Sequence, residues 1–111
     1  MQSSDFLRLK IGKFDCAIIK DLDFQYQAKS FAVNVPEEKL NHYLEKIHYA
    51  PGVIPSPFMA MWIDTGQHQI LIDTGTGYSE KPLSFQGKDH YFKGRLLEVM
   101  KREGIDPAAI D

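Results

Sequence analysis

The sequence has 111 residues, which suits one small domain or part of a larger one. Hydrophobic residues make up 43% and charged residues 25%, an ordinary globular balance that argues against disorder. Thirteen basic and fifteen acidic residues give a net charge of −2, which argues against a nucleic-acid partner. The single cysteine excludes an intrachain disulfide and a cysteine-rich metal site.

The start of the chain and its apolar runs bear on where the protein works. Residues 1–10 are too polar for a signal peptide, and no stretch approaches the roughly 18 apolar residues of a membrane span. We therefore expect a cytoplasmic protein with no membrane partner. The sequence has neither repeats nor low-complexity tracts nor linkers, which predicts a single domain over residues 1–111.

An apolar alternation near the N-terminus predicts a β-hairpin. Residues 6–11, "FLRLKI", alternate apolar and polar, as a half-buried strand does. "GKFD" (12–15) predicts the turn, and "CAIIKD" (16–21) predicts a second short strand.

A proline opens a predicted helix in the next segment. Pro36 takes the first helical position of "PEEKLNHYLEKIH" (36–48), and two glutamates follow it, which suits the positive end of the helix dipole. Three prolines and a glycine in 50–57 predict a loop after this helix. One face of the helix is apolar and is formed by Leu40, Leu44 and Ile47.

The clearest element of the sequence is a second β-hairpin. "FMAMWI" (58–63) predicts a strand, "DTGQ" (64–67) a turn in which Gly66 takes positive φ, and "HQILI" (68–72) the return strand. The first of these strands is apolar on both faces. One face presents Phe58, Ala60 and Trp62, and the other presents Met59, Met61 and Ile63.

The remainder combines a long irregular stretch with a short helix. Residues 74–92 predict a loop, and long loops in small domains often carry function. "KGRLLEVMKREG" (93–104) then predicts a helix that ends at Gly104. Its apolar side chains are Leu96, Leu97 and Met100.

"WIDTGQHQILIDTGTG" (62–77) contains Asp-Thr-Gly twice, a motif with which aspartic proteases hold their catalytic carboxylates. The predicted hairpin separates Asp64 from Asp73 by on the order of 20 Å, because each residue of a strand advances the chain by about 3.3 Å. Two carboxylates that share one water must lie much closer together, so the pair is not an intrachain dyad. Asp64 belongs to the turn, where an Asp side chain accepts backbone hydrogen bonds.

A dimeric protease with one Asp-Thr-Gly per chain, similar to the retropepsins, stays open as an alternative that uses Asp73. Three features count against it. Thr76 follows the motif where those enzymes have Ala or Ser, "FKGR" (92–95) lacks their apolar-apolar-Gly run, and 72 residues precede Asp73.

Three segments together resemble another family. "MWIDTGQHQILIDTGTGY" (61–78) resembles the strand–turn–strand–Asp-Thr-Gly-x-Gly segment of the metallo-β-lactamase superfamily. "GRLLEVMKREGIDPAAID" (94–111) resembles the segment that runs into the next strand of those proteins. "FDCAIIKD" (14–21) and "FAVNVPEEKL" (31–40) are similar to the N-terminal part of the lactonase-like and organophosphate-hydrolase-like branch. The resemblance implies an α+β fold: the N-terminal part of an αββα sandwich, with a mostly antiparallel sheet and one or two helices.

In that superfamily the next strand brings the motif His-x-His-x-Asp-His, which binds two metal ions. The chain ends before such a segment and contains no His-x-His. The resemblance therefore implies zinc or another divalent metal pair in the complete protein, and no metal or other cofactor bound by this chain alone. Its histidines are scattered and none pairs as a zinc site requires: His42, His48, His68 and His90.

For this chain the resemblance implies a supporting role and no catalytic residue. It implies that Asp73 lies beneath the metal site and supports the metal-binding loop by hydrogen bonds, while Gly75 and Gly77 turn the backbone off the strand end. The residues alone indicate that Asp73 caps local backbone amides. The walls of a substrate pocket are expected from Tyr78, Phe85 and Tyr91.

We therefore expect an N-terminal fragment of a metal-dependent hydrolase, which cleaves an ester, lactone or phosphoester only in its complete form. Its bare sheet face predicts self-association or a complementary polypeptide that covers it. A small-molecule substrate belongs to the complete protein alone. A small non-enzymatic interaction domain stays open as the alternative.

Overall fold

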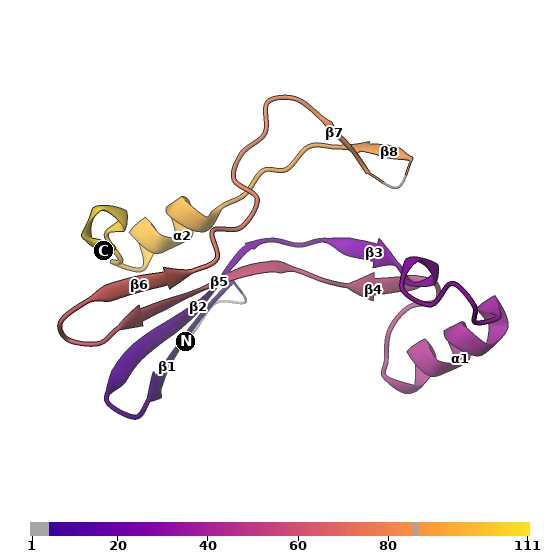
Figure 1. Cartoon of the computed structure of the whole chain (residues 1–111), viewed down its shortest axis with the longest axis horizontal. Coiled ribbons are helices and arrows are strands. Elements are labelled where there is room, and N and C mark those ends of the chain that lie inside the picture. Colours follow the sequence, from indigo (N-terminus) through magenta and orange to yellow (C-terminus); the bar gives the residue numbers. More distant parts are fainter. Residues whose placement is uncertain (1–4, 86) are drawn as a thin grey trace. The chain divides into compact units, whose positions relative to one another are not determined.

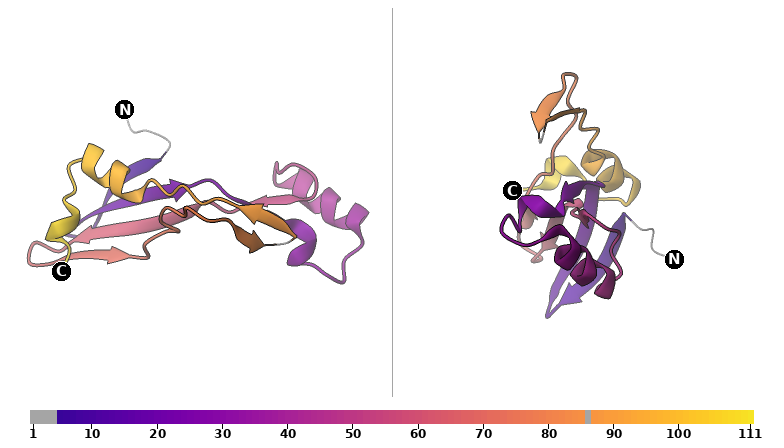
Figure 2. Two further views of the ribbon diagram at one scale, coloured as in Figure 1. Left: turned by 90° about the horizontal axis from the view of Figure 1, so that it is seen from above. Right: turned by 90° about the vertical axis from the view of Figure 1, so that its right-hand side faces the viewer.

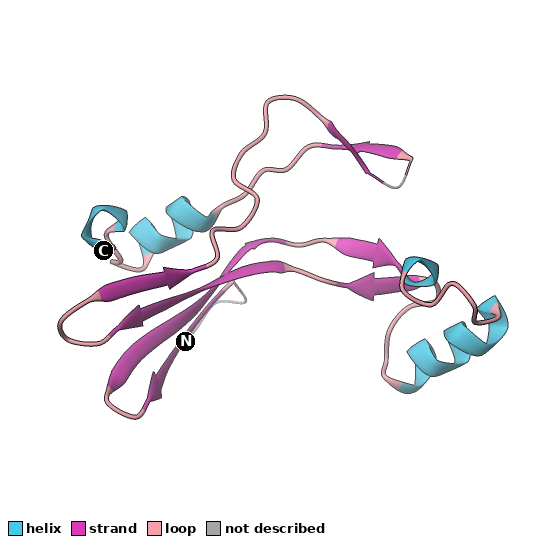
Figure 3. Cartoon of the chain, viewed as in Figure 1, coloured by secondary structure: helices cyan, strands magenta, loops and turns pink. Residues whose placement is uncertain are grey.

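The computed structural model describes residues 5–85 and 87–111, apart from the side chain of Phe85. Two units can be distinguished within the chain (Figures 1 and 3). The first unit joins Met1–Leu22 to Phe58–Asp111, and the second is Asp23–Pro57. The expectation of one domain over the whole chain stays a prediction.

The first unit is built on a four-stranded antiparallel sheet in the order β1-β2-β5-β6 (Figure 1). Both predicted hairpins are confirmed, with β1 at Phe6–Ile11, β2 at Phe14–Leu22, β5 at Phe58–Asp64 and β6 at Gln69–Ile72. The first turn is shorter than "GKFD" predicts, because Ile11 already pairs with Phe14. Only two residues remain for the loop, and Gly12 takes the positive φ of 61° that such a tight hairpin needs.

One face of this sheet is covered by the helix α2, Leu96–Arg102 (Figures 1 and 2). Leu96, Val99 and Met100 lie at i, i+3 and i+4, so a single stripe of the helix is buried. Leu97, which the sequence groups with the apolar side chains of this helix, is exposed. The core consists of Phe6, Ala17, Ile19, Ala60, Trp62, Leu96, Val99, Met100 and Ile105.

The opposite face of the sheet is apolar and open. Strand register aligns two apolar rows across all four strands, because residues paired directly across a ladder point to the same side. These rows are Leu7–Ile18–Met61–Ile72 and Leu9–Cys16–Ile63–Ile70. Leu7, Ile70 and Ile72 are exposed, as is Met59 on the same face. The predicted division of strand 58–63 into a covered and an uncovered side is therefore confirmed.

Ion pairs attach the start of the sheet to α2. Arg102 donates from Nη2 to Asp5 Oδ1 at 2.7 Å and from Nη1 to Asp5 Oδ2 at 3.1 Å. This pairing with Asp5, together with a contact to Glu103, raises the pKa of Arg102. Arg8 donates to the Glu103 carbonyl at 2.8 Å while its guanidinium lies over the Trp62 ring.

The stretch 74–92, predicted as a loop, contains a small hairpin. Its strands are β7, Leu83–Phe85, and β8, Lys88–His90. Ser84 donates from its hydroxyl to Asp89 Oδ1 at 2.7 Å, and a bridge between Tyr78 and Lys93 closes the base of the excursion. The loop prediction was wrong here because both strands are only three residues long, which is too short for an alternation to be recognised, and β8 consists of polar residues alone.

The second unit contains the helix α1, Glu37–Lys46, and a two-stranded ladder of β3, Gln25–Gln27, with β4, Val53–Pro55. A 3-10 turn (η1) at Ala28–Ser30 follows β3. The loop predicted over 50–57 was wrong at β4, where Pro55 is tolerated because this two-stranded ladder consists of edge strands alone.

The helix itself is confirmed, with two differences at its ends. Pro36 caps α1 instead of opening it, with φ −56° and ψ 138°. Leu44 is buried as predicted, but Ile47 lies past the last helical turn and is exposed.

Candidate functional site

The candidate site lies where β2 ends, beside the loop that follows β6. Strand alternation sends Ala17 and Ile19 to the covered face of the sheet, and Asp21 follows them at a shift of the β2–β5 register between Lys20 and Leu22. Asp21 is 1% exposed and is the buried charged residue among those that the structure describes. A buried carboxylate must be satisfied by donors, so its partners define the site.

Both carboxylate oxygens of Asp21 accept hydrogen bonds from distant segments. Oδ2 accepts from the Thr76 backbone N–H at 2.7 Å and from the Thr76 hydroxyl at 3.0 Å. Oδ1 accepts from the Leu96 N–H at 2.8 Å, at the start of α2. The Asp21 carbonyl also accepts from the Arg95 N–H at 2.9 Å. One residue thus joins the end of β2, the loop after β6 and α2.

Two glycines make room for this carboxylate. Gly75 has φ +68°, and a Cβ there would overlap the Asp21 side chain. A Cβ on Gly94 would lie 2.5 Å from Asp21 Oδ1 and 2.7 Å from the Gly77 carbonyl. Gly94 donates its N–H to that carbonyl at 2.9 Å, which holds the two sides of the excursion together. Side chains at either glycine are therefore excluded by the carboxylate.

Asp73 lies apart from this centre. It is exposed and has φ +68°, a left-handed conformation that Asp adopts more readily than most residues. Its Oδ1 accepts from the Thr74 N–H at 2.6 Å and from the Gly75 N–H at 3.3 Å. Asp73 thus caps backbone amides of its own turn, and its support of a metal-binding loop stays a prediction. Asp64 caps the other turn, where its Oδ1 accepts from Gly66 N–H at 2.8 Å.

A cavity of about 330 Å³ opens beside Asp21, between β6, the loop after it and the first turn of α2. Its walls are mostly apolar and include Leu71, Tyr78, Leu96 and Leu97. Tyr78, predicted as a pocket wall, lines this cavity although it is 69% exposed.

The other two predicted pocket walls lie elsewhere in the excursion. Tyr91 follows β8 and is 60% exposed. Phe85 ends β7, and its side chain lies outside the described residues. The expectation of a substrate pocket formed by all three residues stays a prediction.

The side chains that the structure describes do not fit a metal pair. In the described part of the chain, no three His, Cys, Asp or Glu side chains converge as an ion would require. His68 pairs with Asp111, with Nδ1 3.4 Å from Oδ2, and His90 stacks on Phe92. Both histidines therefore contact protein side chains in different places and do not converge on one ion.

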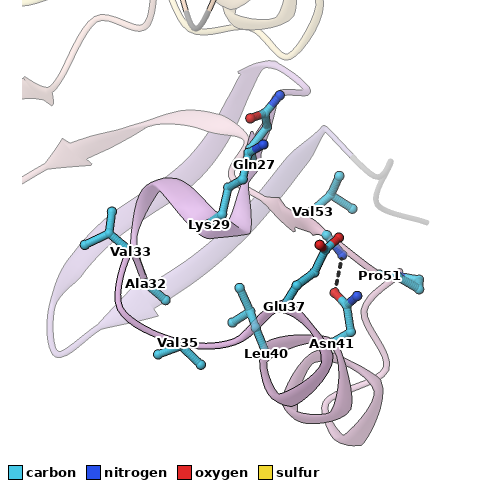
Figure 4. A pocket seen from close by; sticks show the side chains of 11 residues that line it. Gln27, Lys29, Ala32, Val33, Val35, Glu37, Leu40, Asn41, Pro51 and Val53 are labelled. Atoms are coloured by element: carbon cyan, nitrogen blue, oxygen red, sulfur yellow. Dashed lines mark hydrogen bonds between the residues drawn. The ribbon is translucent and has the colours of Figure 1, made fainter.

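A second cavity, also of about 330 Å³, lies within the second unit between η1 and α1 (Figure 4). Aliphatic side chains dominate its lining, among them Val35, Leu40 and Val53, with Lys29 and Glu37 also on its wall. Asn41 accepts the Gly52 N–H at 2.9 Å and fixes the segment before β4. None of the site residues predicted from the sequence lines this cavity.

Sequence reasoning missed Asp21. The sequence "CAIIKD" reads as an apolar strand with a polar end, and its alternation sends Asp21 to the same side as Ile19. That alternation is the one local signal for a buried carboxylate. The donors on Thr76 and Leu96 are 55 and 75 residues away, so sequence periodicity does not reveal them.

The arrangement of sheet, loop and helix is that of a partial metallo-β-lactamase fold. The chain matches the structure of AidC, a dizinc quorum-quenching lactonase in complex with a product, with a TM-score of 0.73 and 24% sequence identity. It matches AbOPH, a hydrolase in the β-lactamase superfamily, with a TM-score of 0.70 and 18% identity. No protein-family model and no curated protein matches the sequence.

These matches extend over almost all of this chain but a minority of the solved proteins. They cover 95% of this chain and 33% of AidC, and 100% of this chain and 35% of AbOPH. The chain therefore spans about a third of the length of the solved structures it matches. The predicted fold, an α+β portion of the metallo-β-lactamase sandwich, is confirmed.

Proposed function

We propose that this chain is the N-terminal part of a metal-dependent hydrolase with the metallo-β-lactamase fold. The complete protein would cleave an ester, lactone or phosphoester of small-molecule size. The two matched proteins, a dizinc lactonase and a hydrolase, support this assignment. Because the described side chains do not fit a metal pair, we assign no step of the reaction to them.

The observation that carries the proposal is the open apolar face of the four-stranded sheet. An antiparallel sheet with one solvated face normally alternates apolar and polar residues, whereas here two unbroken apolar rows cross all four strands. Such a face is expected when a second layer covers the sheet. In the complete hydrolase, that layer would be the rest of the polypeptide.

The same face carries the proposal for a partner. Contiguous exposed apolar surface of this kind favours association. We propose that the 111-residue chain by itself either self-associates through this face or binds a complementary polypeptide there. A monodisperse monomer in light scattering at high micromolar concentration would contradict this part of the proposal.

The decisive experiment compares the chain with the product of the extended coding sequence. We expect an in-frame His-x-His-x-Asp-His a few codons after residue 111. We expect the longer protein to contain close to two divalent metal ions per chain by elemental analysis, and to hydrolyse a panel of lactones, carboxyl esters and phosphotriesters. The 111-residue chain should do neither. A longer reading frame without that motif, or without metal and activity, would overturn the hydrolase assignment.

A non-enzymatic interaction domain is the second candidate, and the exposed apolar face favours it as well. The two candidates separate on the longer protein, since only a hydrolase turns over the substrate panel. Neither matched structure is described as an aspartic protease, so the retropepsin-like alternative gains no support.

None of the described helices is long and apolar enough to cross a bilayer. A cytoplasmic location stays a prediction.

A further inference from the structure

The Asp21 carboxylate holds two segments that are far apart in the sequence. One is residues 73–78, named here the post-β6 loop, and the other is the start of α2. We propose that Asp21 is the residue that positions the post-β6 loop, whereas Asp73 caps the backbone amides of its own turn. The importance of this loop for catalysis rests on the proposed function, whereas the positioning rests on the contacts themselves.

Each carboxylate oxygen of Asp21 accepts hydrogen bonds from a different segment. Oδ2 accepts both donors of Thr76, and Oδ1 accepts the Leu96 N–H. Because Asp21 is almost completely buried, water cannot replace a lost acceptor, and an unmet donor there is costly. Asp73, in contrast, is exposed and accepts only from the next two residues, so its loss leaves those amides open to water.

The glycines around Asp21 support the same assignment, because they belong to the segments that contact its carboxylate. Gly75 and Gly94 face the carboxylate from the post-β6 loop and from the segment before α2. Both positions would clash with Asp21 if they carried a Cβ. The backbone therefore approaches this carboxylate as closely as it can on both sides, which is the geometry of a fixed joint between segments.

This joint also sets the width of the cavity beside it. Thr74 and Tyr78 of the post-β6 loop line one part of the cavity, and Leu96 and Leu97 of α2 line another. Asp21 connects these two walls through Thr76 and Leu96. If the complete protein uses this cavity or the loop above it, Asp21 determines the geometry although it does not reach a reacting group.

The test compares Asp21→Asn with Asp73→Asn in the 111-residue chain. Asn keeps the size of Asp but has one acceptor oxygen, so either Thr76 or Leu96 faces an amide group that cannot accept. We expect amide hydrogen exchange in peptides covering 73–78 or the start of α2 to accelerate at least tenfold in Asp21→Asn, because a lost buried acceptor costs that much or more. Core peptides in β2 and β5 should keep their protection. Asp73→Asn should change exchange only at Thr74 and Gly75.

Three results would overturn the proposal. The first is unchanged exchange in the post-β6 loop and α2 of Asp21→Asn. The second is equal acceleration in Asp73→Asn, and the third is a uniform rise across the core strands, which indicates general destabilisation. If Asp21→Asn does not fold, Gly94→Ala takes its place, since its Cβ displaces the same carboxylate, and the same three results apply. No measurement uses metal or substrate, so a failure here leaves the hydrolase proposal standing, and the reverse also holds.

Discussion

The two faces of the four-stranded sheet are made of similar residues but have opposite surroundings. Ile19 on the covered face is 0% exposed, whereas Ile72 on the open face is 52% exposed. Two apolar rows run across the open face as continuously as the core runs across the covered one. The side chains on both faces of the strands therefore suit a buried environment, but α2 covers only one of the two faces.

The largest effect on stability is expected when the same substitution is made on each face of the sheet. Ile19→Ala should lower the free energy of unfolding by about 3 kcal/mol, because it removes a fully buried side chain and leaves a cavity under α2. In a solution dilute enough for the chain to be monomeric, Ile72→Ala, the same change on the open face, should cost less than about 1 kcal/mol. Urea denaturation followed by circular dichroism measures both. Equal costs would mean that the open face is covered in solution by a second copy or a partner.

The covered face also contains one buried charge, and its removal should have the next largest effect. Asp21→Ala should lower the free energy of unfolding by about 2 kcal/mol, because it leaves the N–H groups of Thr76 and Leu96 without an acceptor. Asp73→Ala serves as the control and should cost about 0.5 kcal/mol, since its donors are exposed. Chemical denaturation of both variants tests this, and a larger cost for Asp73→Ala would refute it.

Charges placed on the open face should weaken the self-association proposed for that face. Ile70→Lys with Ile72→Lys should weaken self-association at least tenfold, because two ammonium groups would have to be desolvated in the interface. Analytical ultracentrifugation over a concentration series measures the change. The matched control is Leu97→Lys, which adds a charge at an exposed position of α2 outside both apolar rows. Unchanged association in the double variant would place the contact elsewhere.

The smallest expected effect lies at the ion pair between α2 and the start of β1. Arg102→Gln should lower the free energy of unfolding only slightly, as expected for a partly exposed ion pair. The hydrogen bonds to Asp5 raise the pKa of Arg102 above its usual value. A cationic group with a raised pKa contributes its full stabilisation below the unfolded value and loses it only at higher pH. The cost of Arg102→Gln should therefore be the same at pH 7 and pH 10.

Much of the first unit follows from its sequence because its signals are local. The alternation in "FLRLKI" and "FMAMWI" and the turn at Asp64–Gly66 locate both hairpins. The stripe of α2 follows from a period of 3.6 residues, although Leu97 falls outside it and Val99 inside it. Each of these features is decided within about ten residues of chain.

The missing parts depend on partners that lie far along the chain or on strands too short for a period. β4 pairs with β3 through three residues on each side, and Pro55 within it argues against a strand. Asp21 looks like the polar end of a strand, and its role depends on donors that folding brings from beyond residue 70. Asp73 drew attention because Asp-Thr-Gly is a recognisable motif, although its contacts are confined to its own turn.

Each face of the sheet contains a natural spectroscopic or chemical reporter. Trp62, the single tryptophan, lies on the covered face and donates from its indole to Gln69 Oε1 at 3.0 Å. Cys16, the single cysteine, belongs to an open-face row yet is 2% exposed, because its neighbours in that row are larger. Tryptophan emission should therefore follow the detachment of α2, while the rate of thiol labelling should follow the opening of the β1–β2 hairpin. The kinetics of α2 detachment and of hairpin opening can therefore be measured separately without introducing a tryptophan or a cysteine.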